Sequence, residues 1–572
     1  LGIVSLSLIG SGVPLGGGFA DLELLIGSTA SQFDELKGFD SAAQWFYTSS
    51  LGSYVTQGRT FNFRQMEVLT GGTKIDRFLV KPLTIGSLQI NGNLPSALPG
   101  DLLRLNLVGV TDPQLFVSSP GNGVFTFAGP HQPIIFTSIE RLDVFDFGDA
   151  PNSFGTLGSV GARHRLGSNL KLGSYVDLEP NGQPSVLANK DDSTGSIDDE
   201  DGVRLPTTLV ADFRAAVVVN ASATAKLDAW IDFNANGTFD ASEQVASSYP
   251  VIAGDNRFEF LVPASAVNGK QIARFRLSSA GGLSPTGLAQ DGEVEDYLVQ
   301  VTALTPGSAV VLDDPLQPGV SVPMLFAAGT SGNDILRVEP LFSDRVKVVL
   351  NGQEIYGPAT QAPLARVGLL GLDGNDQLLL DNDLPLAAEL SGGLGDDVLM
   401  SALLDDFLRG GDGDDTIYGY NGKDTIYGDA GADTLYGMGG ADLMLGGTGS
   451  DRLYGGAGRD FLVGGGGNDR LFGESGDDLL IGGTTTYDAT WNKLQKLHSE
   501  WFSSRNYPDR ASNLRAGNGA ILSGTGLKLM PGLSVIDDAD PDELFGGSDQ
   551  DWFFQLALND QLKDLSAGED VN

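Results

Sequence analysis

The chain has 572 residues, with 74 Asp and Glu against 35 Lys and Arg and a formal net charge of -39. Nucleic acids and anionic membranes would repel so acidic a protein, so neither is an expected partner. The absence of cysteine excludes disulfides and thiolate chemistry, and 79 glycines with few helical patterns predict a mainly β protein of several domains.

Residues 1–145 form the first predicted domain, a β-rich region of short apolar runs broken by Gly, Pro and Ser. The stretches FNFRQMEVL at 61–69 and IIFTSIERL at 134–142 share the order Phe, apolar, Glu, Leu. We interpret this likeness as a weak internal duplication.

The first ten residues, LGIVSLSLIG, alternate in the manner of a strand. They contain neither an initiator Met nor the basic residues of a signal peptide, so we expect that the chain is processed or is part of a longer one. The strand is expected either to join its own domain or to pair with the sheet edge of a neighbouring molecule. No run of 18 apolar residues occurs, so no membrane insertion is expected.

Residues 146–303 have different motifs: DFGDAP, GARH, LDAWIDFNANGTFD, ARFRLSS and, at 292–297, GEVEDY. In this order they resemble the GEVEDY domain of large secreted surface proteins of planctomycete-type bacteria. The resemblance implies a β-sandwich that serves as a building module and not as an enzyme.

Within this domain, DFNANGTFDASE has the spacing of a twelve-residue calcium loop. The candidate ligands are Asp232, Asn234, Asn236, the carbonyl of Thr238, Asp240 and Glu243. Gly237 would form the turn, and the apolar flanks predict strands in place of the helices of an EF-hand. The alternative is a solvated hairpin rich in Asp and Asn.

Further acidic residues of this domain form a second candidate cation site. They are the run Asp198 to Asp201 and the residues Glu293, Glu295 and Asp296, which would share an ion with Asp146 or Asp149. Solvated acidic loops are the alternative.

Residues 304–391 are predicted to be a linker and a degenerate solenoid. The stretch TALTPGSAVVLDDPLQPG, at 302–319, contains three prolines and indicates the linker. GTSGNDILR, from residue 329, and GLDGNDQLL, from residue 371, each match one nonapeptide and are out of register with the repeats that follow.

Residues 392–483 contain ten consecutive nonapeptides, the first of which starts at Gly392. The eighth position is Leu, Ile or Met in every copy, and Gly occupies the first and fourth positions except in 401–409. The sixth position is always Asp: Asp397, Asp406, Asp415, Asp424, Asp433, Asp442, Asp451, Asp460, Asp469 and Asp478.

An apolar residue at every ninth position has to point into a shared interior, which stacking of the repeats provides. Glycine turns let carbonyl oxygens converge, and Asp adds a carboxylate beside them. Such an oxygen-only set suits calcium. A flexible Gly/Asp linker, the alternative, would not need the apolar eighth position.

This register matches the GGxGxDxUx consensus of RTX proteins and resembles their parallel β-roll. The resemblance implies two nonapeptides per turn, with alternate Asp residues on opposite edges and several bound Ca2+ ions. Because cytosolic calcium is scarce, we expect an extracellular or cell-surface location. In the first domain, TGGTKIDRFLV resembles a decayed copy with Asp76 and Phe78 in the acidic and apolar positions.

Residues 484–536 are predicted to be an insertion between repeats. It has one amphipathic helix, at about 488–502, which would cap or flank the open end of the roll. Residues 537–572 are predicted to be terminal repeats and a cap, in which Asp542 and Asp551 take the sixth position.

The sequence predicts no catalytic site. His131, His164 and His498 lie in three different regions, and no HExxH motif occurs. His164 is expected to be a structural hydrogen-bonding residue and His498 a boundary residue.

Two functions fit these observations. The first is a secreted structural or adhesive cell-surface protein, including a subunit of a filament or layer that associates with itself or with other surface components. The second is the non-catalytic calcium-binding or secretion portion of a larger secreted hydrolase.

Overall fold

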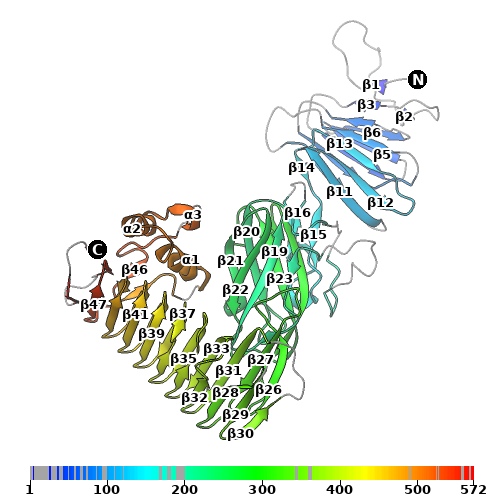
Figure 1. Ribbon diagram of the computed structural model, residues 1–572. Helices are drawn as coiled ribbons and strands as arrows, with labels where there is room; N and C mark the ends of the chain where they lie inside the picture. Colours follow the sequence, from blue (N-terminus) through cyan, green and yellow to red (C-terminus); the bar gives the residue numbers. More distant parts are fainter. Residues whose placement is uncertain are drawn as a thin grey trace. The chain divides into compact units, whose positions relative to one another are not determined.

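The structure is a computed structural model in which strands dominate (Figure 1), so the mainly β architecture is confirmed. It describes residues 4–5, 25–26, 35–37, 43–48, 51–56, 59–64, 68–71, 75–84, 87–92, 100–107, 110–119, 121–166, 170–176, 182–188, 200–341, 345–357, 364–488, 491–522, 525, 527–554, 560–565 and 569–571.

The chain divides into two compact units. The first comprises residues 1–204, 218–257 and 270–299, and the second comprises residues 205–217, 258–269 and 300–572.

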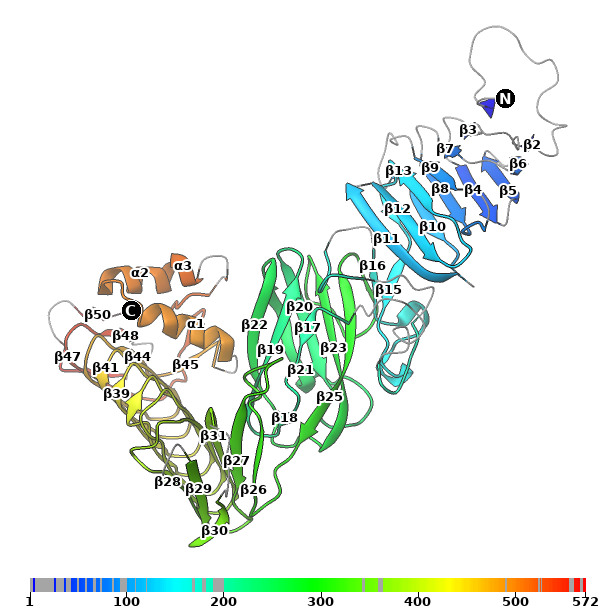
Figure 2. The ribbon, with the colours of Figure 1, turned by 45° about the vertical axis from the view of Figure 1, so that its right-hand side comes forward.

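The N-terminal part of the first unit contains two sheets (Figure 2). In order, the strands of one sheet are β1 (Val4–Ser5), β3 (Glu35–Lys37), β7 (Val68–Thr70), β9 (Leu88–Asn91), β13 (Ile134–Thr137), β12 (Asn122–Ala128) and β11 (Thr111–Ser119). Those of the other are β14 (Arg141–Leu142), β10 (Leu102–Leu105), β8 (Asp76–Val80), β4 (Ala43–Thr48), β5 (Leu51–Thr56), β6 (Arg59–Arg64) and β2 (Leu25–Ile26).

From β7 onward the chain passes back and forth between these sheets and adds parallel strands to each. The region is therefore a two-sheet solenoid with a hairpin, β11–β12, inserted. Its core includes the stacked rings of Trp45 and Phe78. The two similar stretches do not occupy equivalent places, because Leu69 of the first lies in β7 of one sheet and Leu142 of the second lies in β14 of the other. Of the first ten residues, only Val4 and Ser5 are described, and they pair with β3 of the same chain.

The sandwich region contains a three-stranded sheet, a five-stranded sheet and a small additional sheet. The first is β17 (Val203–Arg204), β19 (Arg214–Ala221) and β22 (Gly254–Leu261). The second is β18 (Leu209–Val210), β25 (Glu293–Thr302), β23 (Gly269–Ser278), β20 (Ala225–Ile231) and β21 (Gln244–Val251). The third is β15 (Phe145–Phe147), β16 (Arg163–Arg165) and β24 (Leu288–Ala289). The 3-10 turns η2 (Asn152–Phe154) and η3 (Gly158–Val160) lie between β15 and β16, and η4 (Ala241–Glu243) lies between β20 and β21.

The second unit contains the predicted roll, built from two long and mostly parallel sheets. One has, in order, β26 (Ala309–Asp313), β27 (Pro323–Ala328), β31 (Arg366–Asp373), β33 (Ala387–Leu394), β35 (Phe407–Asp412), β38 (Thr425–Ala430), β40 (Leu443–Thr448), β42 (Phe461–Gly466), β44 (Leu479–Ile481), β48 (Trp552–Phe554) and β50 (Asp570–Val571). The other has β30 (Gln353–Tyr356), β29 (Arg345–Leu350), β28 (Ile335–Leu341), β32 (Gln377–Leu380), β34 (Val398–Met400), β36 (Thr416–Tyr418), β39 (Thr434–Gly440), β41 (Arg452–Gly458), β43 (Arg470–Ser475), β47 (Glu543–Ser548) and β49 (Gln561–Lys563), with β37 (Asn421–Gly422) beside β39.

Within the ten repeats, neighbouring strands in each sheet are one turn apart, as the pairing of Ile417 with Leu435 and of Ile426 with Met444 shows. This confirms two nonapeptides per turn. The residue at the eighth position is fully buried in all ten repeats and belongs to one core between the sheets. Outside that core, Tyr418, Tyr436 and Tyr454 stack with ring centroids 4.9 Å apart.

The insertion begins and ends in a short pair of strands, β45 (Thr484–Thr485) and β46 (Val535–Ile536). Its described residues form α1 (Trp491–Trp501), α2 (Tyr507–Ala516) and α3 (Gly519–Leu522), so the expectation of a single helix was wrong. The polar helix α2 nonetheless has sequence signals at both ends. The side chain of Asn506 caps its N-terminus by accepting the backbone N–H of Asp509, and Gly517 ends it in a left-handed conformation.

The helices lie together on one side of the roll (Figure 1), where Leu494, Leu497 and Trp501 pack against β40, β42 and β44. They therefore cover a sheet face and do not close its end. The sequence contains a signal for this face, since Leu443, Leu445, Phe461, Val463, Leu479 and Ile481 are the large apolar residues on either side of the eighth position in alternate repeats. After the insertion, β47 and β48 continue the sheets as predicted. None of the helices in the described residues is long and apolar enough to cross a bilayer.

Candidate metal centre

The repeated Asp residues form two ladders along the roll. In each ladder the backbone N–H of one Asp donates to Oδ1 of the Asp one turn later, as Asp415 does to Asp433 over 2.8 Å. One ladder runs through Asp397, Asp415, Asp433, Asp451 and Asp469, and the other through Asp406, Asp424, Asp442, Asp460 and Asp478. The structure thus brings the ten predicted residues into two lines, as the alternation of repeats implied.

The second carboxylate oxygen, Oδ2, is buried, and in nine of these ten Asp residues it has no hydrogen-bond partner among the residues that the structure describes. It faces the first glycine of its own repeat. A Cβ atom on Gly410 would overlap Oδ2 of Asp415 and would lie 2.8 Å from the carbonyl oxygen of Gly428, one turn further on. Carboxylate and carbonyl oxygens therefore converge where only a hydrogen atom now lies.

Burial makes these carboxylates costly to ionise in the absence of a cation. Burial and the charges of Asp433 and Asp397 raise the pKa of Asp415 to about 8. Burial and the charges of Asp442 and Asp406 raise the pKa of Asp424 to about 9. A cation bound between successive turns would neutralise the ladder carboxylates and would be coordinated by their Oδ2 atoms.

Calcium fits this arrangement, because the available donors are all oxygens and come from flexible glycine turns as well as from carboxylates. The residues that would hold it are the ladder Asp residues and the glycines that face them. The bound ion would supply positive charge at each step of the ladder.

Asp406 differs from the other nine. In its repeat Ser401 replaces the first glycine, and the Ser401 hydroxyl donates to the carbonyl oxygen of Gly419. Oδ2 of Asp406 also accepts the N–H of Ala402 at 3.3 Å. A hydroxyl therefore takes the place where an ion would bind, and we expect Asp406 to be the weakest ligand of the set.

The ladders extend beyond the ten repeats. The backbone N–H of Asp334 donates to Oδ1 of Asp376, and that of Asp376 donates to Oδ1 of Asp397. The two isolated nonapeptides therefore lie in line with the array. The sequence did not predict this alignment, because Asp334 and Asp376 are 42 residues apart and Asp376 and Asp397 are 21 apart, whereas successive ladder residues of the array are 18 apart. At the other end, Asp469 and Asp478 donate to the predicted Asp542 and Asp551, across the insertion.

Comparison with protein families agrees with this geometry. The GEVED domain matches residues 226–300, and the RTX calcium-binding nonapeptide repeat matches four stretches, 403–435, 418–453, 436–471 and 454–484. No curated protein matches the chain. The chain therefore contains a GEVED domain and an RTX array, and because such repeats bind Ca2+, the roll is a calcium-binding element. The GEVED match is shorter than the predicted 146–303, and the bacterial group stays a prediction.

The predicted calcium loop lies between two strands, β20 and β21, as expected. Oδ1 and Oδ2 of Asp232 accept the N–H groups of Asn236 and Gly237 at 3.1 and 3.0 Å, and Glu243 accepts those of Asn234 and Asp240. The side-chain amides of Asn234 and Asn236 both donate to Asp240, and Thr238 donates to Asn236. The candidate ligands thus converge, although their oxygens are already hydrogen-bonded within the loop.

Across the described residues, no group of three or more acidic or histidine side chains has an arrangement that could hold a metal ion. The oxygens that converge along the roll come from backbone carbonyls as well as from carboxylates, as at Gly410, and so do not form such a group. Calcium binding by the loop at 232–243 stays a prediction.

That prediction can be tested on the full chain with Asp232→Asn combined with Glu243→Gln, which removes both charges and leaves each side chain one of its two acceptor oxygens for the backbone N–H groups of the loop. Wild-type β20 and β21 should exchange amide hydrogens more slowly in calcium, by about 100-fold at 100 times the dissociation constant. The double variant should lose this difference, as hydrogen exchange with mass spectrometry would show. Asp255→Asn, at an exposed ion pair with Arg204, is the control. A wild-type loop that ignores calcium would contradict the prediction.

The second predicted acidic site is wrong for the residues that are described. Asp296 forms a fully buried bidentate pair with Arg274, with two contacts of 2.7 Å. Glu295 accepts the N–H of Gly202, and Asp146 accepts that of Val294. These carboxylates are buried structural acceptors, so they are neither ligands of one ion nor solvated loops. Asp198 and Asp199 lie outside the described residues.

His164 is a structural hydrogen-bonding residue, as expected. Its Nδ1 lies 2.8 Å from the carbonyl oxygen of Asp291, and Arg276 donates to its Nε2. His498 is buried beside Phe502 and not at a boundary, and burial lowers its pKa to about 4.

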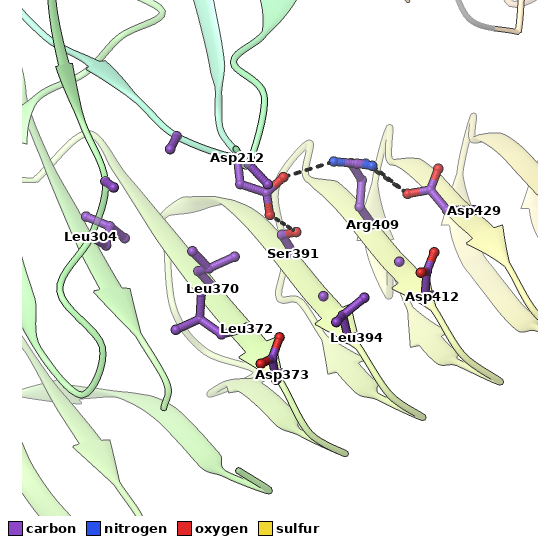
Figure 3. Close-up of a pocket in the computed structure, with 15 residues that line it drawn as sticks. Asp212, Leu304, Leu370, Leu372, Asp373, Ser391, Leu394, Arg409, Asp412 and Asp429 are labelled. Carbon is purple, nitrogen blue, oxygen red and sulfur yellow. Dashed lines mark hydrogen bonds and ion pairs between the residues drawn. The ribbon is translucent and has the colours of Figure 1, made fainter. Parts of the chain in front are cut away.

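A cavity of about 450 Å³ lies in the second unit (Figure 3). Leucines line part of it, and Arg409 lies between Asp212 and Asp429, at 3.2 and 2.7 Å. Ser391 donates to Asp212. The guanidinium of Arg409 and the hydroxyl of Ser391 thus both bind neighbouring carboxylates, which is the pattern of a structural charge cluster.

Proposed function

We propose that the chain is a secreted structural or adhesive protein of the cell surface, in which calcium converts the roll into a stiff rod. The observation that carries this proposal is the pair of Asp ladders, in which nine buried Oδ2 atoms have no hydrogen-bond partner within the described part of the chain. At neutral pH such ladders need a cation to neutralise them, and calcium is abundant outside cells and scarce in the cytosol. The array of β modules is of the kind that serves as a spacer or scaffold.

Assembly into a filament or layer is the finer part of the proposal. The two sheets of the roll have β26 and β30 as their end strands on one side and β50 and β49 on the other. End strands of a sheet have backbone N–H and C=O groups that can hydrogen-bond to a strand of another molecule. They can therefore act as docking surfaces that require little of the partner's side-chain sequence. The partner would be a second copy or another surface component.

The second candidate, a calcium-binding portion of a larger secreted hydrolase, is supported by the same roll. The two proposals differ in self-association, because a secretion module has no need to polymerise.

Electron microscopy of the purified chain in millimolar calcium is expected to show assemblies that EGTA disperses. Because β1 pairs with β3 of its own chain, deletion of residues 1–10 should leave the assembly length unchanged. Shorter assemblies would instead show that this strand is exchanged between molecules. A chain that stays monomeric at high concentration in calcium would contradict the assembly proposal and favour the hydrolase portion.

A further inference from the structure

The N-terminal solenoid repeats the connectivity of the roll, although no RTX match extends to it. The backbone N–H of Asp76 donates to Oδ1 of Asp101 at 2.7 Å, and that of Asp101 donates to Glu140 at 2.8 Å. Each of these acids precedes or begins a strand of one sheet: β8, β10 and β14. This is a third acidic ladder, with spacings of 25 and 39 residues in place of 18.

Glycines face this ladder as they do in the roll. A Cβ atom on Gly71 would lie 2.6 Å from Oδ2 of Asp76 and 2.9 Å from the carbonyl oxygen of Gly92. A Cβ atom on Gly92 would lie 2.5 Å from Oδ2 of Asp101 and would overlap the carbonyl oxygen of Ser138. In both places a carboxylate oxygen and a carbonyl oxygen from the next turn converge on a glycine.

Asp101 supplies the observation that points to a ligand. Its side chain is fully buried, with 0% exposure, and Oδ2 has no hydrogen-bond partner in the part of the chain that the structure describes. Oδ1 already accepts the N–H of Asp76, so the carboxylate is held with its second oxygen toward Gly92 and Ser138. A structural role alone would leave this oxygen desolvated without compensation.

We propose that Asp101, with Asp76 and the carbonyl oxygens of Gly92 and Ser138, forms a divalent-cation site of the calcium class in the N-terminal solenoid. The donors named are all oxygens, and two of them are carboxylates. Calcium tolerates irregular oxygen sets from turns, whereas magnesium demands a near-octahedral set at shorter distances. The site lies outside the matched repeats and goes beyond the proposed function, which rests on the roll.

The test is hydrogen exchange with mass spectrometry on the full chain, in calcium and in EGTA, with a magnesium arm. In the wild type, calcium should slow exchange in 76–80 and 102–105 by about 100-fold at 100 times the dissociation constant, and magnesium should not. Asp101→Asn keeps an oxygen for the N–H of Asp76 but removes the charge, so the calcium response of these strands should vanish. Residues 416–481 of the roll should respond in both proteins.

Asp143→Asn is the matched control, because Asp143 pairs with Arg104 and Arg165 and faces neither Gly71 nor Gly92, the described glycines of the ladder. It should keep the full calcium response. A wild-type N-terminal region that ignores calcium while the roll responds would overturn the inference, as would a full response in Asp101→Asn. A roll that ignores calcium would instead contradict the proposed function.

A second measurement tests the site without Asp101→Asn, in case that variant does not fold. The indole N–H of Trp45 donates to Asp76, and Trp45 is the only Trp in residues 1–204. Terbium bound at the site should therefore emit on Trp excitation, and Trp45→Phe should remove that part of the emission. Emission that is the same in both proteins would overturn the inference.

Discussion

In calcium-free buffer the roll is expected to be unfolded at pH 8 and largely folded at pH 5. The folded pKa values of its ladder carboxyls are raised above the ordinary Asp value, to about 7 for Asp433 and about 8 for Asp469, with burial as the main cause. A raised folded pKa contributes stability that is present below the unfolded pKa and is lost as pH rises through the folded value. Each pKa unit corresponds to about 1.4 kcal/mol. The stability lost when several such carboxyls ionise therefore exceeds the free energy of unfolding of an ordinary domain, about 5–15 kcal/mol.

Calcium should reverse this dependence, because the ion binds the ionised carboxylates and protons compete with it. With millimolar calcium the roll should be folded at pH 8 and should lose stability on acidification. Far-UV circular dichroism of the full chain at both pH values, with and without calcium, measures the change. A calcium-free β signal that is equal at pH 5 and pH 8 would show that the ladder carboxyls do not control folding.

Gly464→Ala should disrupt the roll, whereas Gly466→Ala in the same repeat should be tolerated. A Cβ atom on Gly464 would lie 2.5 Å from Oδ2 of Asp469 and would overlap the carbonyl oxygen of Gly482. The backbone carbonyl cannot rotate away as a flexible side chain would, so we expect a loss of about 1–3 kcal/mol from overpacking alone. The same methyl group would occupy the place of an ion, which adds to the loss.

Gly466 is the matched control, since a Cβ atom there meets nothing within 4 Å among the described residues. Its replacement should change the free energy of unfolding by no more than about 0.5 kcal/mol. Calcium titrations followed by circular dichroism give the midpoint of folding, and calorimetry gives the number of ions bound. Equal midpoints and equal ion counts for the two variants would refute the assignment of this glycine to the cation site.

The roll and its Asp ladders were accessible from sequence because every step repeats the same local chemistry. An Asp and an apolar residue two positions later recur with a fixed period, so one copy such as 428–436 defines the environment of all the others. The two ladders, the buried eighth position and the continuation after the insertion follow from that period and were confirmed.

Where the period varies, the sequence predicted the isolated nonapeptides of a degenerate solenoid but not the Asp ladder that they join. Asp334 and Asp376 lie on the ladder, although a hairpin and a longer turn displace them from the count. In the N-terminal β-rich region only one decayed repeat, with Asp76, was predicted, and Asp101 was missed because 25 residues separate it from Asp76 in place of 18. Backbone pairing tolerates such insertions in its loops, and a search for a fixed spacing does not.

The sequence by itself determined the elements that depend on neighbours along the chain: the glycine turns, the Asp ladders and the apolar line inside the roll. Tertiary structure alone decided the fate of isolated charges and apolar faces. Asp296 resembled a calcium ligand until folding placed Arg274, 22 residues away, against it. Likewise, Phe461 and Leu479 require a cover that the helices provide. Partners distant in sequence leave no periodic trace, so burial and charge pairing of this kind become visible only when the chain is folded.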